Sequence, residues 1–174
     1  MHIVIDSREQ TPWHFPEHLA QVSRGTLNAG DYALAGDQHF AIERKSVDDL
    51  AGTLSSGWAR FERELERMQS QLFIARVVIV EGDIGRIVHS EHNHSQVTAR
   101  FLFRRIAQLT LGNVTVLFAA NPITAAGVAY SIFRVREETL NGEVRDNQRD
   151  GSASQAGSGL DFSEIGLALD DPEN

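Results

Sequence analysis

The chain has 174 residues, no cysteine and a formal net charge of −8. Without cysteine it can form neither disulfides nor a thiolate zinc site. It contains no run of about 18 apolar residues that would predict a membrane span. The first ten residues lack the basic start and the apolar segment of a secretory signal, so we expect a cytoplasmic protein.

The negative charge is concentrated at the C-terminal end. Residues 139–174 hold eight acidic residues against two arginines, whereas residues 1–138 hold 16 acidic and 14 basic residues. The larger part is therefore close to neutral, and the net charge does not exclude a nucleic-acid partner. We expect one domain over residues 1–138, which is an ordinary length for a single domain.

Residues 139–174 differ from the rest in composition as well as in charge. Most of the segment is polar, rich in glycine and serine and without periodicity, which predicts disorder. Residues 160–171 regain apolar side chains among acids. This short stretch has two interpretations: a frayed end, or a peptide that folds when it docks on a protein partner.

The first half of the chain predicts short strands joined by turns. Residues 1–6 form an alternating stretch that is rich in β-branched side chains, and this pattern predicts a strand that ends at Asp6. Residues 7–18 contain two prolines and read as a loop. Turn signals then flank residues 32–34 and 39–45, which we predict to pair as a hairpin. Together these strands suit a β-meander.

The second half is predicted to alternate helices with strands. The helices are expected over 46–54, 58–72, 95–111 and 122–138, and buried strands over 76–82 and 114–120. Ser46 and Asn121 are favourable N-cap residues, and Gly112 is a favourable helix end. Alternating helices and strands predict an α/β fold with helices on both faces of a layered sheet. The antiparallel first half makes that sheet mixed.

Lys45 is the only lysine among 16 basic residues. Along the predicted strand, Glu43 and Lys45 point to one face and Arg44 to the other. Asp31 at the start of the neighbouring strand adds a second carboxylate. Two carboxylates can hold Mg²⁺, which prefers oxygen ligands, polarises phosphoryl groups and lowers the pKa of bound water. A lysine beside such a site offers a compact charge with an adjustable pKa, which arginine does not.

Three motifs give the chain a resemblance to a known family. "IDSRE" at 5–9, "AGDY" at 29–32 and "IERKSVDD" at 42–49 resemble the XPF-type structure-specific DNA endonucleases. Their pattern is Gly-Asp-Tyr, a spacer, Glu-Arg-Lys, three residues and Asp. The run from Ile5 to Phe15 looks most similar to small stand-alone versions that phages often carry. The resemblance covers residues 1 to about 138.

The resemblance implies a three-layer α/β/α restriction-endonuclease-like fold with a central mixed sheet. It implies hydrolysis of DNA phosphodiester bonds that depends on Mg²⁺, with Mn²⁺ as a substitute. The expected substrates are branched, forked or flapped DNA in repair, recombination or replication, and family members often act as dimers. Larger members carry a helix-hairpin-helix module after the nuclease domain, whereas this chain has an acidic tail, so a protein partner of the tail could supply substrate selectivity.

The resemblance also implies roles for individual residues. Asp31 and Glu43 would be the metal ligands and Lys45 the catalytic lysine. The site would be completed or braced by Asp6, Glu9, Arg44 and Asp49. The expected DNA-binding residues are Arg8, Arg44 and Arg60.

Several of these residues also have structural interpretations. Asp49 could simply be an acid in the first turn of a helix. Arg8 and Arg44 could be ion-pair partners of nearby carboxylates instead of phosphate contacts. Arg60 lies on a helix with interleaved glutamates, which suits a solvated face as well as a DNA track. At the level of function, the alternative is a catalytically weak DNA-binding or adaptor module that recruits a partner through its tail. A restriction-type nuclease that cuts a specific sequence is a third interpretation.

Overall fold

A computed structural model describes residues 1–70, 75–89 and 98–142 of the chain. The first half holds β1 (His2–Asp6), β2 (Gln21–Gly25), β3 (Tyr32–Leu34), β4 (Phe40–Ser46) and α1 (Val47–Leu54). The second half holds α2 (Trp58–Ser70), β5 (Ala75–Glu81), α3 (Gly85–His89), α4 (Ala99–Leu111), β6 (Val114–Ala119) and α5 (Pro122–Asn141).

The strands form one mixed sheet in the order β2-β1-β3-β4-β5-β6. β1, β3 and β4 are antiparallel neighbours, which confirms the predicted hairpin of β3 and β4. The predicted meander is interrupted, because β2 comes between β1 and β3 in the chain. β2 pairs in parallel with β1, and β5 and β6 continue in parallel from β4. β2 was not predicted, because its sequence is short and mostly polar. Its residues are mostly exposed, as suits an edge strand.

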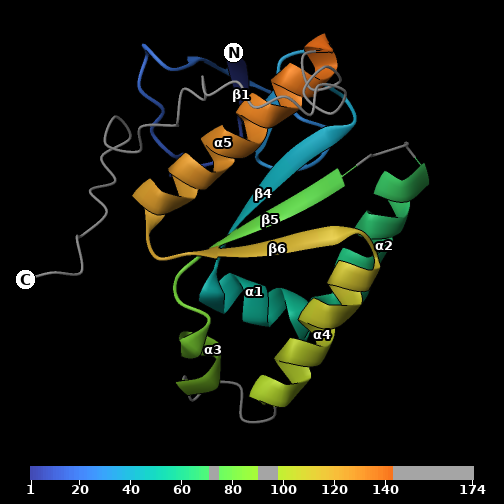
Figure 1. The fold of residues 1–174 in the computed structure, drawn as a ribbon. Helices are drawn as coiled ribbons and strands as arrows, with labels where there is room; N and C mark the ends of the chain where they lie inside the picture. The colour runs from blue at the N-terminus through green and yellow to red at the C-terminus, as the bar shows by residue number, and fades with distance from the viewer. Residues whose placement is uncertain (71–74, 90–97, 143–174) are drawn as a thin grey trace, which may run out of the picture.

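Helices cover both faces of the sheet, which confirms the predicted three-layer α/β/α architecture (Figure 1). α5 packs on one face, where Phe133 joins Ile3 and Ile79 in a buried apolar cluster. The helices α1, α2, α3 and α4 lie on the other face, where Leu54 and Leu102 pack with neighbouring strand residues. β4 therefore crosses the middle of a sheet that is anchored from both sides.

The helix ends largely follow the predicted caps. The Ser46 side chain accepts a hydrogen bond from the backbone N–H of Asp49 at the start of α1. Asn121 caps α5 in the same way, and Gly112 ends α4. α4 starts after Thr98, later than predicted, and α5 runs to Asn141, past the predicted boundary at 138.

The strand predicted over 114–120 is not fully buried. β6 has β5 as its one neighbour in the described sheet, and only its two ends are buried. The short helix α3 was also not predicted, because five residues are too few to show a helical period. The predicted tail over 143–174, with its candidate peptide at 160–171, lies outside the described residues. Among the described helices, none has the length and apolar content needed to cross a bilayer.

Candidate active site

Asp31 owes its position to the glycine before it. Gly30 has a φ of 73°, a backbone conformation that residues other than glycine rarely adopt. A Cβ there would lie 2.8 Å from the Ala41 Cβ and 3.0 Å from the Ile42 carbonyl oxygen. The absence of a side chain lets this turn lie against β4, where the Asp31 N–H donates to the Ile42 carbonyl at 2.9 Å. The glycine of the Gly-Asp-Tyr motif therefore places the first carboxylate beside β4.

Asp31, Glu43 and Lys45 line one pocket of about 550 Å³, which α1, the start of α2 and the loop between them also border. Glu43 and Lys45 alternate along β4 as predicted, and the Lys45 Nζ lies 2.9 Å from Glu43 Oε1. Their side chains are 31% and 15% exposed, so the ion pair is shielded but reachable from solvent. Two carboxylates and the chain's one lysine thus lie in the same pocket.

The Asp31 carboxyl group has an unusual proton affinity. Burial raises the pKa of Asp31 to about 7, and the nearby negative charge of Glu43 adds to the effect. The backbone N–H of Arg44 donates to Asp31 Oδ2 at 2.8 Å and opposes the shift. Ionising Asp31 is therefore more costly in the folded protein than in water.

Asp6 is 1% exposed and its oxygens are fully engaged. They accept hydrogen bonds from the backbone N–H and side chain of Arg8 and from the backbone N–H of Leu27. The hydrogen bonds from Arg8 are the main reason that the pKa of Asp6 falls far below its usual range. Arg8 is nevertheless 71% exposed and lines the pocket, so Asp6 holds an accessible cation in place.

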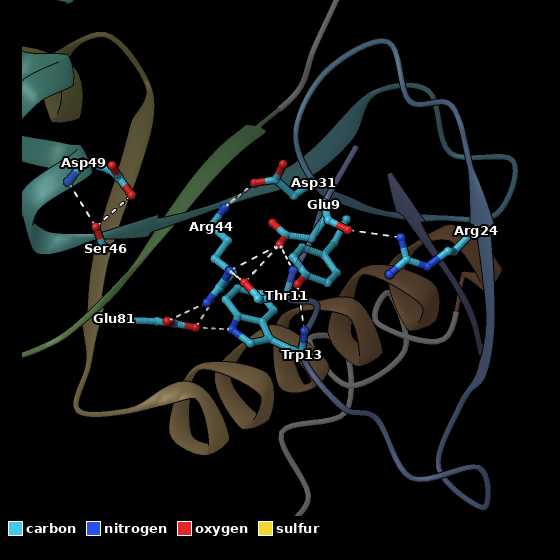
Figure 2. Close-up of polar contacts among 10 residues, drawn as sticks. Glu9, Thr11, Trp13, Arg24, Asp31, Arg44, Ser46, Asp49 and Glu81 are labelled. Atoms are coloured by element: carbon cyan, nitrogen blue, oxygen red, sulfur yellow. Dashed lines mark hydrogen bonds and ion pairs between the residues drawn. The ribbon is translucent and has the colours of Figure 1, made fainter. Parts of the chain in front are cut away.

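The Arg44 side chain is bound to two carboxylates, Glu9 just after β1 and Glu81 at the end of β5 (Figure 2). Its Nε and Nη2 donate to the two oxygens of Glu81 at 2.8 and 2.9 Å. Its Nη1 donates to Thr11 at 2.8 Å and to Glu9 at 3.3 Å. The Trp13 indole N–H donates to the same Glu81, whose pKa burial would raise but these hydrogen bonds lower. Arg44 thus matches the ion-pair interpretation.

Glu81 and Trp13 were not among the residues predicted for the site. Trp13 is buried and stacks on Tyr32, with 4.4 Å between ring centroids. Glu81 ends β5, whose parallel register places it beside Ser46 of β4. The one signal in the sequence was the position of Glu81, an acid at the end of a buried apolar strand. Such a position is informative because the carboxyl ends of parallel strands meet at one edge of a sheet. Its partners are 37 and 68 positions away along the chain, so no local pattern reports them.

The structure places the other predicted residues around this centre. Glu9 is 11% exposed and accepts from the Thr11 N–H at 2.8 Å as well as from Arg44. Asp49 lines the pocket but closes a capping pair with Ser46, whose hydroxyl donates to Asp49 Oδ2 at 2.8 Å. Arg60 is exposed at the start of α2 and also lines the pocket.

The donor set of the pocket fits a hard divalent cation. Among the described residues, no three His, Asp or Glu side chains are close enough to enclose a metal ion. Mg²⁺ does not need such a cage, because it usually binds through one or two carboxylates and keeps waters or phosphate oxygens as its other ligands. Asp31 and Glu43 provide two carboxylates, and the charge of Glu43 adds to the effect of burial on the pKa of Asp31, a repulsion that a cation would relieve.

Comparisons with known proteins identify the family of the chain. The ERCC4 domain family matches residues 5–132, which include every predicted catalytic residue. The chain belongs to the ERCC4 domain family. A solved structure of XPF from Aeropyrum pernix is similar to this ERCC4 domain, with a TM-score of 0.61 and 25% sequence identity. The likeness covers 78% of this chain and 61% of the archaeal one. No curated protein sequence matches the chain.

These matches confirm the predicted XPF-type family and fold. The ERCC4 domain spans somewhat under two thirds of the archaeal XPF chain. The similarity to small stand-alone phage versions is not tested by either match and stays a prediction.

Proposed function

We propose that this ERCC4 domain is a Mg²⁺-dependent endonuclease that hydrolyses phosphodiester bonds in branched, forked or flapped DNA. The observation that carries the proposal is the shared pocket of Asp31, Glu43 and Lys45. Membership of the ERCC4 family and the likeness to an archaeal XPF support it. DNA repair, recombination and replication all produce such substrates.

Asp31 and Glu43 would hold Mg²⁺, with Mn²⁺ as a substitute. When bound, the ion supplies Lewis-acid polarisation of the phosphoryl group and a more acidic water. The fit rests on two oxygen donors in one partly buried pocket and on their mutual repulsion.

We assign to Lys45 the role of orienting the attacking water. Its Nζ is held by Glu43 at 2.9 Å, so a water or phosphate oxygen in the pocket would meet an oriented ammonium group. That group can donate a hydrogen bond to a water in a fixed direction and balance the negative charge that develops on the phosphoryl oxygens. A compact ammonium suits both tasks better than a broad guanidinium.

Arg8 and Arg60 are the proposed contacts to DNA phosphates, because both line the pocket and both are exposed. Asp6 holds Arg8 in place. Arg44 and Glu9 brace β4, which carries Glu43 and Lys45, and Asp49 braces the start of α1. Contacts of this kind position the backbone without reading bases. Cleavage is therefore expected to follow DNA shape more than sequence, in contrast to a restriction-type enzyme.

The experiment is a cleavage panel on end-labelled flap, fork and blunt duplex DNA of equal length, with Mg²⁺, Mn²⁺ or EDTA. We expect cuts near the junction of the branched substrates with either metal and none in EDTA. Equal cutting of all three substrates would remove the branched-DNA selectivity. Binding of forked DNA without cleavage under any divalent ion would favour the adaptor alternative and overturn the nuclease.

The oligomeric state and the partner of the tail complete the proposal. Because family members often dimerise, we expect a homodimer, which light scattering of the purified chain would detect. The acidic residues at 160–171 are the proposed contact for a protein partner.

A further inference from the structure

We call the pocket of Asp31, Glu43 and Lys45 the acidic pocket. A second, smaller hollow lies next to it on the same face of the sheet. It measures about 270 Å³, and Val4, Ala33 and Ala41 are among the residues that line it. Val4 pairs with Ala33 across β1 and β3, and Ala41 precedes Ile42, the residue that pairs with Tyr32. These three small side chains form one row across the sheet. We call this hollow, with its floor of Val4, Ala33 and Ala41, the alanine groove.

The alanine groove continues the acidic pocket along β4. Side chains two positions apart on a strand share a face, so Ala41, Glu43 and Lys45 point the same way. The step from Ala41 to Glu43 is about 7 Å along the strand, so the groove and the carboxylates are close neighbours. Arg8 lies between the acidic pocket and the alanine groove. It lines the pocket, and its Nη2 donates to the carbonyl of Leu27, which lines the groove.

The described helices leave this part of the sheet open. Every lining residue of the groove comes from β1, β3, β4 or the two connections at 26–29 and 36–38. Ala33 and Ala41 are 6% and 5% exposed, so the floor is a smooth apolar surface at the bottom of a depression. Thr26, Asn28 and Gln38 line the same hollow and are exposed, and they add hydrogen-bonding groups above the apolar floor.

The charge of the groove does not suit a phosphate. Asp37 is the one ionisable residue among those that line it, and its carboxylate is paired with Arg136 at 2.7 Å. The groove is thus close to neutral, while Arg8 and Arg60 border the acidic pocket next to it. A strand that places its scissile phosphate at Asp31 and Glu43 would bring an adjacent sugar and base, not a phosphate cluster, over the alanine floor.

We propose that the alanine groove binds one unpaired nucleotide next to the scissile phosphate and so selects junctions over continuous duplex. The inference rests on the proposed nuclease function and adds the site that recognises the single strand. A volume of about 270 Å³ admits one base or sugar but not the side of a duplex. Proteins commonly bind single-stranded bases by stacking on a flat side chain and by hydrogen bonds to the base edges. In the groove, the flat alanine floor would take the place of the stacking side chain, and the polar side chains would bind the edges.

The first test compares DNA binding by Ala33→Leu and Ala35→Leu. Ala33 lies on the groove floor, whereas Ala35 is exposed and does not line the groove, so the two variants add the same bulk two residues apart. The probes are a fluorescein-labelled fork with one unpaired arm and a blunt duplex of equal length, measured by anisotropy with Ca²⁺ in place of Mg²⁺. Thermal melting verifies that both variants fold.

We expect Ala33→Leu to weaken fork binding about tenfold, which corresponds to the loss of one base contact of about 1.4 kcal/mol. Blunt-duplex binding should stay unchanged, and Ala35→Leu should match the parent on both probes. A folded Ala33→Leu protein that keeps the parent ratio of fork to duplex affinity would overturn the inference.

A second measurement covers the case in which Ala33→Leu does not fold. The parent protein is photo-crosslinked to a fork that carries 4-thiothymidine at the first unpaired position, and the adducts are mapped by mass spectrometry. Adducts within 26–29 or 33–41 support the groove, and adducts confined to α1 and α2 contradict it. These binding results are separable from the nuclease proposal, which fails if the parent cuts no DNA at all.

Discussion

At the scale of single residues, Asp31 combines burial, negative charge and a backbone hydrogen bond in one carboxyl group. The first two effects raise its pKa to about 7, whereas the Arg44 N–H lowers it. A cation that binds beside such a carboxyl group would stabilise its ionised form and lower its pKa. Asp31 is therefore the residue through which the pocket's electrostatics can be measured without DNA.

The pH dependence of stability follows from that pKa. The folded pKa of about 7 lies above the ordinary value of 3.8. Between about pH 4 and pH 7 the folded state therefore binds more protons than the unfolded state, and this contribution to stability is lost as pH rises through 7. In EDTA, the unfolding free energy of Asp31→Asn relative to the parent should therefore increase by about 1–3 kcal/mol from pH 5 to pH 8, allowing for partial solvent exposure.

Urea unfolding of the two proteins at pH 5, 6, 7 and 8 measures this difference directly. Because other groups titrate equally in both proteins, only the difference between them reports Asp31. A difference that stays constant across the range would show that Asp31 is not the perturbed group.

At the scale of secondary-structure elements, the turn between β3 and β4 is tied to α5 by a buried ion pair. Arg136 Nε lies 2.7 Å from Asp37 Oδ2, with side chains 13% and 2% exposed. Arg136→Gln would leave the Asp37 carboxylate buried without its cation, at a cost of about 3 kcal/mol in unfolding free energy.

Arg134 gives a matched control on the same helix. It is 49% exposed and pairs only within α5, with Glu137 and Glu138 among the described residues. Arg134→Gln should therefore cost less than about 1 kcal/mol. Chemical denaturation of both variants tests the contrast, and equal losses would mean that the link from turn to helix contributes no more than a surface pair.

Elements with a strong local pattern were predictable from sequence. The alternation before Asp6, the helical spacing after Trp58 and the caps at Ser46 and Asn121 all have their cause within a few residues. β2 and α3 were missed because they are short and take their stability from neighbours. The exposure of β6 depends on the order of strands in the sheet, which no local pattern encodes.

The candidate site divides in the same way. The side-chain alternation of Glu43 and Lys45 and the turn at Gly30 are local, and the structure brings both together with Asp31. The choice between ion pair and phosphate contact for Arg44 was open because Glu81 comes from a distant strand. The alanine groove was also hidden, since it requires the register of three strands at once.

At the scale of the whole molecule, the mixed sheet carries the acidic pocket and the alanine groove on one face, opposite α5. The face combines charged groups for a phosphate with a neutral hollow for a neighbouring nucleotide. Family membership and the likeness to an archaeal XPF support the proposed nuclease function. The central claim is that Asp31, Glu43 and Lys45 form the catalytic centre.

The most direct measurement of that claim is the single-turnover rate of cleavage of the parent's best branched substrate in Mg²⁺. Asp31→Asn, Glu43→Gln and Lys45→Arg keep shape or charge and should each slow cleavage about 100-fold or more. Asp48→Asn is the control, because Asp48 is exposed, lines the same pocket and lies in the first turn of α1. It should stay within about threefold of the parent. A folded Glu43→Gln or Lys45→Arg protein that cuts at the parent rate would contradict the account.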